Sequence, residues 1–390
     1  MPHNHTVYSQ LLSLIPRVQF DRVVARFGGN RYVKTFRCWS QFIANCYAQI
    51  TGKESLRDIE TSFRTQRPKL YHMGCAEVKR ATLAHANEHR DYRIYEELFY
   101  ALLSKCHGMT GRAAKKKFTF KNRLYLLDST TIDLCLSLFP WAKFRRRKGA
   151  IKLHCLFEER EALPSFLVVT DGKHHDVTTA KETTFPVSPD SIIVADKAYV
   201  DFDWLKSLDS RGIFLVTRAK ENMTYRVVGQ HSAGTNKHIL ADEKILLTGP
   251  LSSRKYPEKL RLVTFYDEEH DKIYRFLTNN FTLAPSTIAR IYKARWDIEL
   301  FFKWIKQNLK IKSFLGCTKN AVLTQIWTAM IYYLLLTYIK YQTKYGRSLL
   351  DFSRVITTAL FDRIHLVDLL SLNETTLHKV LPEKEQLVFL

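Results

Sequence analysis

The chain has 390 residues, which is enough for two or three domains or for one core with appended segments. Its formal net charge is +22, so a polyanion is the first partner to consider, and nucleic acid is the commonest one. Lysine and arginine are spread along the whole chain, which argues against a ribosomal or membrane-surface protein with its charge concentrated in a tail.

The cysteines and the apolar runs indicate the compartment. Seven cysteines are scattered singly without a CxxC pair, which argues against a zinc ribbon and against a disulfide framework and fits a reducing cytoplasm. The first ten residues do not form a signal peptide. The most apolar run, 322–341, contains Gln325 and three threonines, and we interpret it as a buried helix rather than a membrane span. We therefore expect a cytoplasmic protein with no membrane partner.

Residues 1–115 have helical periodicity. The segment 36–63 predicts a helix, a turn at 51–53 and a second helix from Ser55, and 77–106 predicts further helix. A helix, a tight turn and a second helix with scattered basic residues outline a DNA-binding unit. A plain helical bundle fits the same pattern equally well.

Strand patterns begin after a basic linker at 111–122. They predict three strands, a helix, a strand, a helix and a strand, which is the order of an α/β, ribonuclease H-like core over residues 120–317. The first strand is expected to end on Asp128 and the fourth on Asp196. The expected strands are 123–130, 150–158, 163–172, 191–199 and 213–218, with helices at 175–185 and 204–210.

Residues 220–277 interrupt this order with short alternating segments separated by Gly, Asn and Pro. We predict a β-rich insertion whose last strand or two rejoin the core. Helical periodicity resumes at Pro285, and 318–390 is predicted as a mainly helical C-terminal region.

The segment YKARWDIELFFKWIK, 292–306, places four polar residues on one side of a predicted single helix. At 100° per residue, Tyr292, Arg295, Glu299 and Lys306 fall within an arc of roughly 60°. The aromatic and aliphatic residues on the other side are expected to be core, and they are Trp296, Leu300, Phe301, Phe302, Trp304 and Ile305. A charged stripe of this kind is also typical of a solvated helix face with ion pairs.

Three acids stand out by context: Asp128, Asp196 and Glu299. The first and fourth strands of a ribonuclease H-like sheet are neighbours, so the two aspartates would lie side by side with Glu299 packed against them. Such a cluster repels itself unless cations occupy it, and carboxylate oxygens suit Mg²⁺ or Mn²⁺. Two ions ~3.5–4 Å apart can serve phosphodiester chemistry.

The chain resembles bacterial insertion-sequence transposases of the DDE type, in the insertion-sequence-four (IS4) family. That family's signature is Tyr, two residues, Arg, three residues, Glu, six residues, Lys, which Tyr292, Arg295, Glu299 and Lys306 match in full. The blocks LLDSTTIDL around Asp128 and VADKAYVDF around Asp196 resemble its first two acidic blocks. The resemblance covers nearly the whole chain.

The resemblance implies binding of terminal inverted repeats, metal-dependent DNA cleavage and strand transfer, with Asp128, Asp196 and Glu299 as catalytic metal ligands. It implies that Tyr292, Arg295 and Lys306 contact the DNA end and that at least a homodimer assembles on paired ends in the nucleoid. Some members stack a flipped base on a tryptophan in the insertion, but residues 205–295 contain none. The candidates to replace it are Tyr225, Tyr256 and Phe265.

Weaker signals remain. In FRRRKG, Arg145, Arg146 and Arg147 are expected to contact DNA phosphates, with Trp141 beside them as a candidate for touching nucleic acid. The tail Gln386–Leu390 resembles peptides that dock on the bacterial sliding clamp, with the final pair reversed, or is simply a frayed terminus. Two alternatives to an active transposase stay open: a catalytically retired, transposase-derived DNA-binding protein, and a nuclease of the same fold with another substrate.

Overall fold

The computed structural model describes residues 5–107, 117–145, 148–231, 236–309, 311 and 313–371. The chain divides into two compact units. One unit is a helical body made of Met1–Thr110 together with Asn308–Leu390, and the other is Gly111–Gln307, which contains the sheet.

The second unit is built on one ten-stranded sheet. Its strand order is β2-β3-β1-β5-β6-β10-β9-β8-β7, and β4 pairs with β3 off this path. The strands are β1 (Leu124–Leu134), β2 (Lys143–Arg145), β3 (Lys148–Glu158), β4 (Leu163–Asp171), β5 (Ile192–Ala195), β6 (Phe214–Arg218), β7 (Tyr225–Gln230), β8 (Ile239–Leu247), β9 (Leu260–Asp267) and β10 (Lys272–Thr278).

The connections agree with the predicted chain order. β1, β3 and β4 form antiparallel pairs, and β5 and β6 then add in parallel beside β1. The strands of the segment predicted as an insertion do not form a separate sheet, because β10 pairs with β6 and carries β9, β8 and β7 with it. The prediction that the last of these strands rejoins the core is therefore confirmed.

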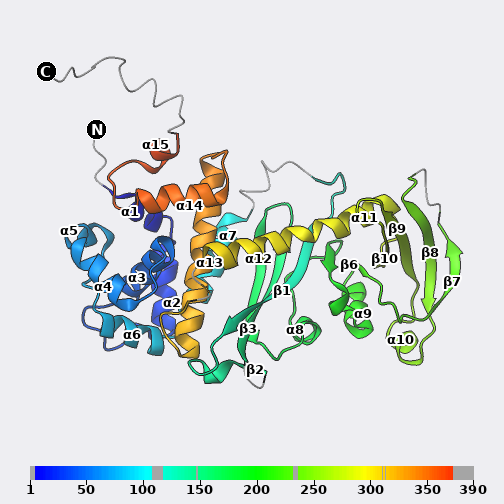
Figure 1. Cartoon of the computed structure of the whole chain (residues 1–390), viewed down its shortest axis with the longest axis horizontal. Coiled ribbons are helices and arrows are strands. Elements are labelled where there is room, and N and C mark those ends of the chain that lie inside the picture. Colours follow the sequence, from blue (N-terminus) through cyan, green and yellow to red (C-terminus); the bar gives the residue numbers. More distant parts are fainter. Residues whose placement is uncertain are drawn as a thin grey trace, which may run out of the picture. The chain divides into compact units, whose positions relative to one another are not determined.

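Among the described residues of this unit, five α-helices accompany the sheet. α11 and α12, drawn in yellow, run across one face of the sheet (Figure 1). The other face is covered by an apolar cluster to which α8 and α9 contribute Ala180, Trp204, Leu205 and Leu208. The helices are α8 (Asp176–Glu182), α9 (Phe202–Ser210), α10 (Pro250–Lys255), α11 (Pro285–Ala294) and α12 (Trp296–Asn308).

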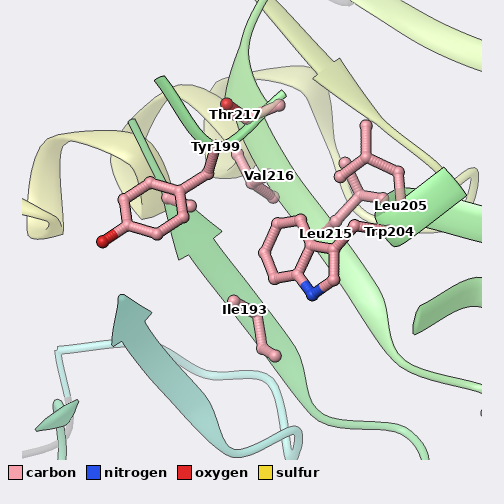
Figure 2. Close-up of a pocket in the computed structure, with 8 residues that line it drawn as sticks. Ile193, Tyr199, Trp204, Leu205, Leu215, Val216 and Thr217 are labelled. Carbon is pink, nitrogen blue, oxygen red and sulfur yellow. The ribbon is translucent and has the colours of Figure 1, made fainter. Parts of the chain in front are cut away.

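This apolar cluster is closely packed. Figure 2 shows side chains of β5, β6 and α9, among them Ile193, Trp204 and Leu215, gathered around a small gap. The gap measures about 10 Å³, which is close to the least that holds one water molecule. It therefore cannot take a substrate, and it is a packing defect of the core.

The helical unit confirms the predicted turn at 51–53 and the second helix from Ser55. α3 (Cys38–Thr51) ends at Gly52, which has the left-handed φ of 67° that favours glycine, and α4 (Leu56–Thr65) begins at Ser55, whose hydroxyl accepts the N–H of Asp58. The remaining helices are α1 (Val7–Ser13), α2 (Arg17–Arg26), α5 (Arg67–Leu70), α6 (Arg80–His89), α7 (Arg93–Cys106), α13 (Lys319–Gln342), α14 (Leu349–Thr358) and α15 (Leu366–Ser371).

The apolar run near the C-terminus forms α13. This helix is long and apolar enough to cross a membrane, but 89% of its most apolar window is buried inside the structure. It packs against α3, α6, α7 and α14, and Asn320 near its start donates to the carbonyls of Asn87 and Arg90. The prediction of a buried helix is therefore confirmed.

Candidate active site

Sheet register brings two aspartates to neighbouring positions. β1 and β5 are parallel, and Leu127 of β1 lies opposite Ala195 of β5. Asp128 directly follows Leu127 and Asp196 directly follows Ala195, so the two aspartates lie next to each other across the two strands. Side chains alternate between the faces of a strand, and Leu127 belongs to the apolar cluster, so Asp128 points to the other face, where α11 and α12 lie. β1 does not end on Asp128 as predicted, because its pairing with β3 continues to Leu134.

The segment 292–306 is not the single helix that was predicted. α11 ends at Ala294, α12 begins at Trp296, and Arg295 lies between them. Around this point the hydrogen bonds tighten to i→i−3, from Arg295 N–H to Tyr292 O and from Ile298 N–H to Arg295 O. A regular step of 100° per residue does not continue through such a turn, so the prediction of one continuous helix is wrong. Tyr292 and Glu299 are consequently on two helices, with Arg295 at their junction.

Arg295 connects the acids. Its Nη2 lies 2.6 Å from Glu299 Oε1, and its Nη1 lies 3.3 Å from Asp128 Oδ2. Tyr292 Oη lies 3.5 Å from Asp196 Oδ1, at the long limit of a hydrogen bond. The two aspartates also accept the backbone N–H of the following residue, at 2.8 Å for Asp128 and 2.6 Å for Asp196. The structure therefore gathers Asp128, Asp196, Tyr292, Arg295 and Glu299 in one place.

Burial and neighbouring charges shift the pKa values of three groups in this cluster. Burial raises the pKa of Asp128 to about 6. The Ser129 N–H and Arg295 lower this pKa, and the nearby carboxylates of Glu299 and Asp196 raise it further. Burial by itself lowers the pKa of Arg295, but Tyr292, Glu299 and Asp128 outweigh it and raise that pKa above its ordinary value. Burial also raises the pKa of Tyr292, which Arg295 opposes. The site thus holds more negative charge than Arg295 alone neutralises.

These residues fit a divalent cation. Three carboxylates lie around Arg295, and hard oxygen donors are what Mg²⁺ and Mn²⁺ prefer. Asp128 accepts through both of its oxygens, so a cation there would share the oxygen that Arg295 now contacts. A cation between them would offset the burial that raises the pKa of Asp128 and the smaller repulsion from Glu299 and Asp196. Asp128, Asp196 and Glu299 are therefore the residues that could hold the metal.

A polar network behind Asp128 was not found from the sequence. Ser129 Oγ donates to Asp176 Oδ1 at 2.6 Å, and Lys152 Nζ lies 3.1 Å from the same oxygen. His174 of the DGKHHD loop pairs with Asp171 rather than with Asp176. These contacts join β1 and β3 to α8 on the face of the sheet opposite to Asp128. They could not be predicted from the sequence, because they depend on the pairing of β1 with β3 and on the position of α8.

Several predicted residues lie elsewhere or outside the described part. Lys306 is half-buried on α12, two turns beyond Glu299. Trp296 and Leu300 are exposed by 59% and 48%, so their assignment to the core is wrong, because a helix laid on a sheet buries only one side. That buried side is formed by Ile298, Phe301, Phe302 and Ile305, and the Phe301 ring packs in a tilted arrangement against Phe157 of β3, 5.0 Å between centroids.

The remaining weaker candidates have mixed outcomes. Tyr256 is 1% exposed within the apolar cluster, which removes it as a surface for stacking a base. Trp141 is half-buried. Arg146, Arg147, the side chain of Arg145 and the tail Gln386–Leu390 lie outside the described residues.

A sheet that presents two aspartates to a helix junction carrying an arginine and a glutamate, in a chain this basic, is the arrangement expected of metal-dependent enzymes that act on phosphodiesters. The model of the "Transposase DDE domain" matches residues 119–335, and the chain belongs to this family of DDE transposases. Membership implies a ribonuclease H-like core, dependence on a divalent metal and binding to DNA. A second model, "Domain of unknown function (DUF4372)", matches residues 3–76.

Curated relatives agree with this membership. The chain is 33% identical over 285 residues to "Putative transposase y4zB" of Sinorhizobium fredii (strain NBRC 101917 / NGR234), covering 72% of this chain and 77% of the relative. It is 31% identical over 255 residues to "Probable transposase for insertion sequence element IS5377" of Geobacillus stearothermophilus, covering 65% of each chain. It is 25% identical over 313 residues to "Putative transposase for insertion sequence element IS4SA" of Synechocystis sp., covering 79% and 85%. Membership of the IS4 family is consistent with these relatives.

Proposed function

We propose that this DDE transposase binds the terminal inverted repeats of an insertion sequence, cleaves the DNA at their ends and joins the freed ends to target DNA. The observation that carries the proposal is the cluster of Asp128, Asp196 and Glu299 around Arg295, from two neighbouring strands and the α11–α12 junction. A DNA-binding protein without catalysis has no need to hold a half-buried carboxylate beside two others, with its pKa raised to about 6.

The three carboxylates would hold two Mg²⁺ ions, for which Mn²⁺ can substitute. When bound, the ions supply an activated water or 3′-hydroxyl and stabilise the leaving oxygen. The chain itself supplies a fixed frame. Asp128 and Asp196 are held by backbone N–H groups beside them, and Glu299 is held on a helix whose Phe301 packs against β3.

The cationic and aromatic residues of the signature would position the DNA. Arg295 already bonds carboxylate oxygens, and its planar guanidinium is equally suited to two oxygens of a phosphate. Tyr292 is fixed between Phe276, at 4.9 Å between ring centroids, and the Arg295 guanidinium, at 5.7 Å. Lys306 would add a point charge two turns further along α12. Arg145, Arg146 and Arg147 would bind DNA phosphates.

The domain roles follow from this function. Residues 120–317 would be the ribonuclease H-like catalytic core with a β-rich insertion at about 220–277. Residues 1–115 would be the helical DNA-binding domain that reads the transposon end, and 318–390 a helical region. We assign the active form as a homodimer on paired ends, working in the cytoplasm on nucleoid DNA. The tail Gln386–Leu390 would be the segment to test for binding the sliding clamp.

The test is cleavage of a labelled duplex that carries the terminal repeat of the element. We expect nicking at the repeat end with Mg²⁺ and none with EDTA. Glu299→Gln should lower the rate at least a hundredfold, because a lost metal ligand removes several kcal/mol of transition-state stabilisation and ~1.4 kcal/mol is tenfold.

The matched control is Glu268→Gln, which makes the same change on a side chain 64% exposed in the β9–β10 turn. It should cleave like the unchanged protein. Binding of the repeat with no cleavage in either Mg²⁺ or Mn²⁺ would refute the proposal and favour the retired DNA-binding protein.

A further inference from the structure

The segment that matches a domain of unknown function contains an open hollow of about 530 Å³. It lies between α2, the following loop and the start of α3. Three arginines line it, and all three are exposed. The lining residues that matter here are Arg17, Asp21, Asn30, Arg31, Arg37 and Trp39.

The hollow has a rigid wall. Gly28 has a φ of 62°, and a Cβ on Gly29 would approach Ile94 Cδ1 to 2.6 Å and Cys38 Sγ to 2.7 Å, so the loop is pressed against the helical core. Asn30 Oδ1 accepts the N–H of Cys38 at 2.8 Å, which ties the loop to the start of α3. The backbone that carries Arg31 is therefore packed against the helices on one side and bonded to α3 on the other.

Two of the arginines in the hollow, Arg17 and Arg31, lie against aromatic rings. The guanidinium of Arg17 lies 4.1 Å above the Trp39 ring, and the Trp39 indole N–H donates to Met73 O. Arg31 lies 5.0 Å over the ring of Tyr32, which is 89% exposed and has a φ of 59°. A large aromatic ring held exposed beside an arginine offers an apolar surface for a sugar next to a cation for a phosphate.

The charge balance favours an anion. Asp21 lies 3.0 Å from Arg17 and neutralises that one cation, which leaves Arg31 and Arg37 in excess. Because the arginines are exposed along an open hollow rather than closed around a point, the shape suits a polymeric phosphate backbone more than a small free anion.

We propose that this hollow binds the phosphate backbone of duplex DNA, with Arg31 and Arg37 contacting phosphates and Tyr32 lying against the sugar. The inference rests on the proposed function and deepens it, since it assigns the DNA contact within the domain of unknown function. The contact is independent of base sequence, so it would strengthen binding to any duplex equally.

The experiment measures binding of the full chain in EDTA, where no cleavage is expected, to a labelled duplex of the terminal repeat and to a scrambled duplex of the same length. The Arg31→Ala, Arg37→Ala double variant should weaken binding of both duplexes roughly tenfold or more and lower the salt slope by about 2, because each phosphate contact contributes about 0.9. Asp21→Asn should tighten binding severalfold, since it removes a carboxylate that repels phosphate.

The matched control is Arg22→Ala, which removes one charge from an exposed side chain of the same helix outside the hollow. Arg22→Ala should leave the salt dependence of DNA binding unchanged. Unchanged binding by both the double variant and Asp21→Asn would overturn the inference, as would displacement of DNA by inorganic phosphate at constant ionic strength, which indicates a site for a small anion. Failure of the proposed function is seen separately, because Glu299→Gln should lose cleavage while keeping this binding.

Discussion

Asp128→Asn is expected to lower cleavage by a factor of a thousand or more, of order 4 kcal/mol in the barrier, and yet to make the metal-free protein more stable at neutral pH. The loss of activity follows from removing a carboxylate in the centre of the acid cluster. The gain in stability follows from the same carboxylate, because its charge is buried and repelled by Glu299 and Asp196. Asparagine keeps the shape and the acceptor for the Ser129 N–H.

The pH dependence of this effect has a defined sign. The folded-state pKa of Asp128 is raised from 3.8 to about 6, so the protonated form is favoured by folding. The associated stability is fully present below pH 3.8 and is lost as pH rises through about 6. Above that range Asp128→Asn should exceed the unchanged protein in free energy of unfolding by about 1–3 kcal/mol.

Thermal unfolding of both proteins in EDTA, across this pH range, measures the difference. The two melting temperatures should converge at low pH and separate in favour of Asp128→Asn above pH 6. Mg²⁺ should raise the melting temperature of the unchanged protein more than that of Asp128→Asn. A variant less stable than the unchanged protein at neutral pH would show that Arg295 fully compensates the cluster.

Asp242→Asn is expected to cost about 3–5 kcal/mol, because it leaves the buried guanidinium of Arg261 without its counter-charge. The two side chains form a two-pronged pair at 2.8 and 2.6 Å and are 0% and 3% exposed. Arg261 also donates to the carbonyls of Asn280 and Leu283, just before α11 begins. The pair therefore holds the chain segment that leads to Tyr292.

Hydrogen exchange in β8, β9 and the 279–284 loop provides the measurement. The exchange of these amides should speed up about a hundredfold or more, since ~1.4 kcal/mol is a factor of ten. Glu243→Gln, a neutral substitution at the next, half-buried position of β8, is the control and should exchange like the unchanged protein. Equal exchange in both variants would mean that the Arg261 charge is accommodated without Asp242.

The positions of Asp128 and Asp196 could be predicted from the sequence, because they depend on local apolar runs and on the order of the strands. Asp128 and Asp196 come at the end of apolar runs, and the alternation of strands and helices makes those runs neighbours in one sheet. The turn at Gly52 and the start of α4 at Ser55 were predictable from local chemistry. Glycine adopts the left-handed φ that ends a helix, and the serine hydroxyl accepts a backbone N–H at a helix start.

Other features depend on contacts between distant residues and could not be predicted. The break at Arg295 is one, since nothing in YKARWDIELFFKWIK requires the turn, and Arg295 there bonds Asp128, 167 residues away. The Ser129–Asp176 contact and the Asp242–Arg261 pair likewise join separate strands and helices. The exposure of Trp296 is a further case, because a pattern shows an apolar side chain but not what covers it.

The most direct test of the account is whether Asp196 ligates the metal that cleavage requires. Asp196→Cys replaces a hard oxygen donor by a softer thiolate, which Mg²⁺ accepts poorly and Mn²⁺ accepts better. The account predicts that Asp196→Cys loses cleavage of the terminal-repeat duplex in Mg²⁺ and regains a substantial part of it in Mn²⁺, whereas Asp133→Cys, an exposed position on β1, cleaves equally in both. Full activity of Asp196→Cys in Mg²⁺ would contradict the account.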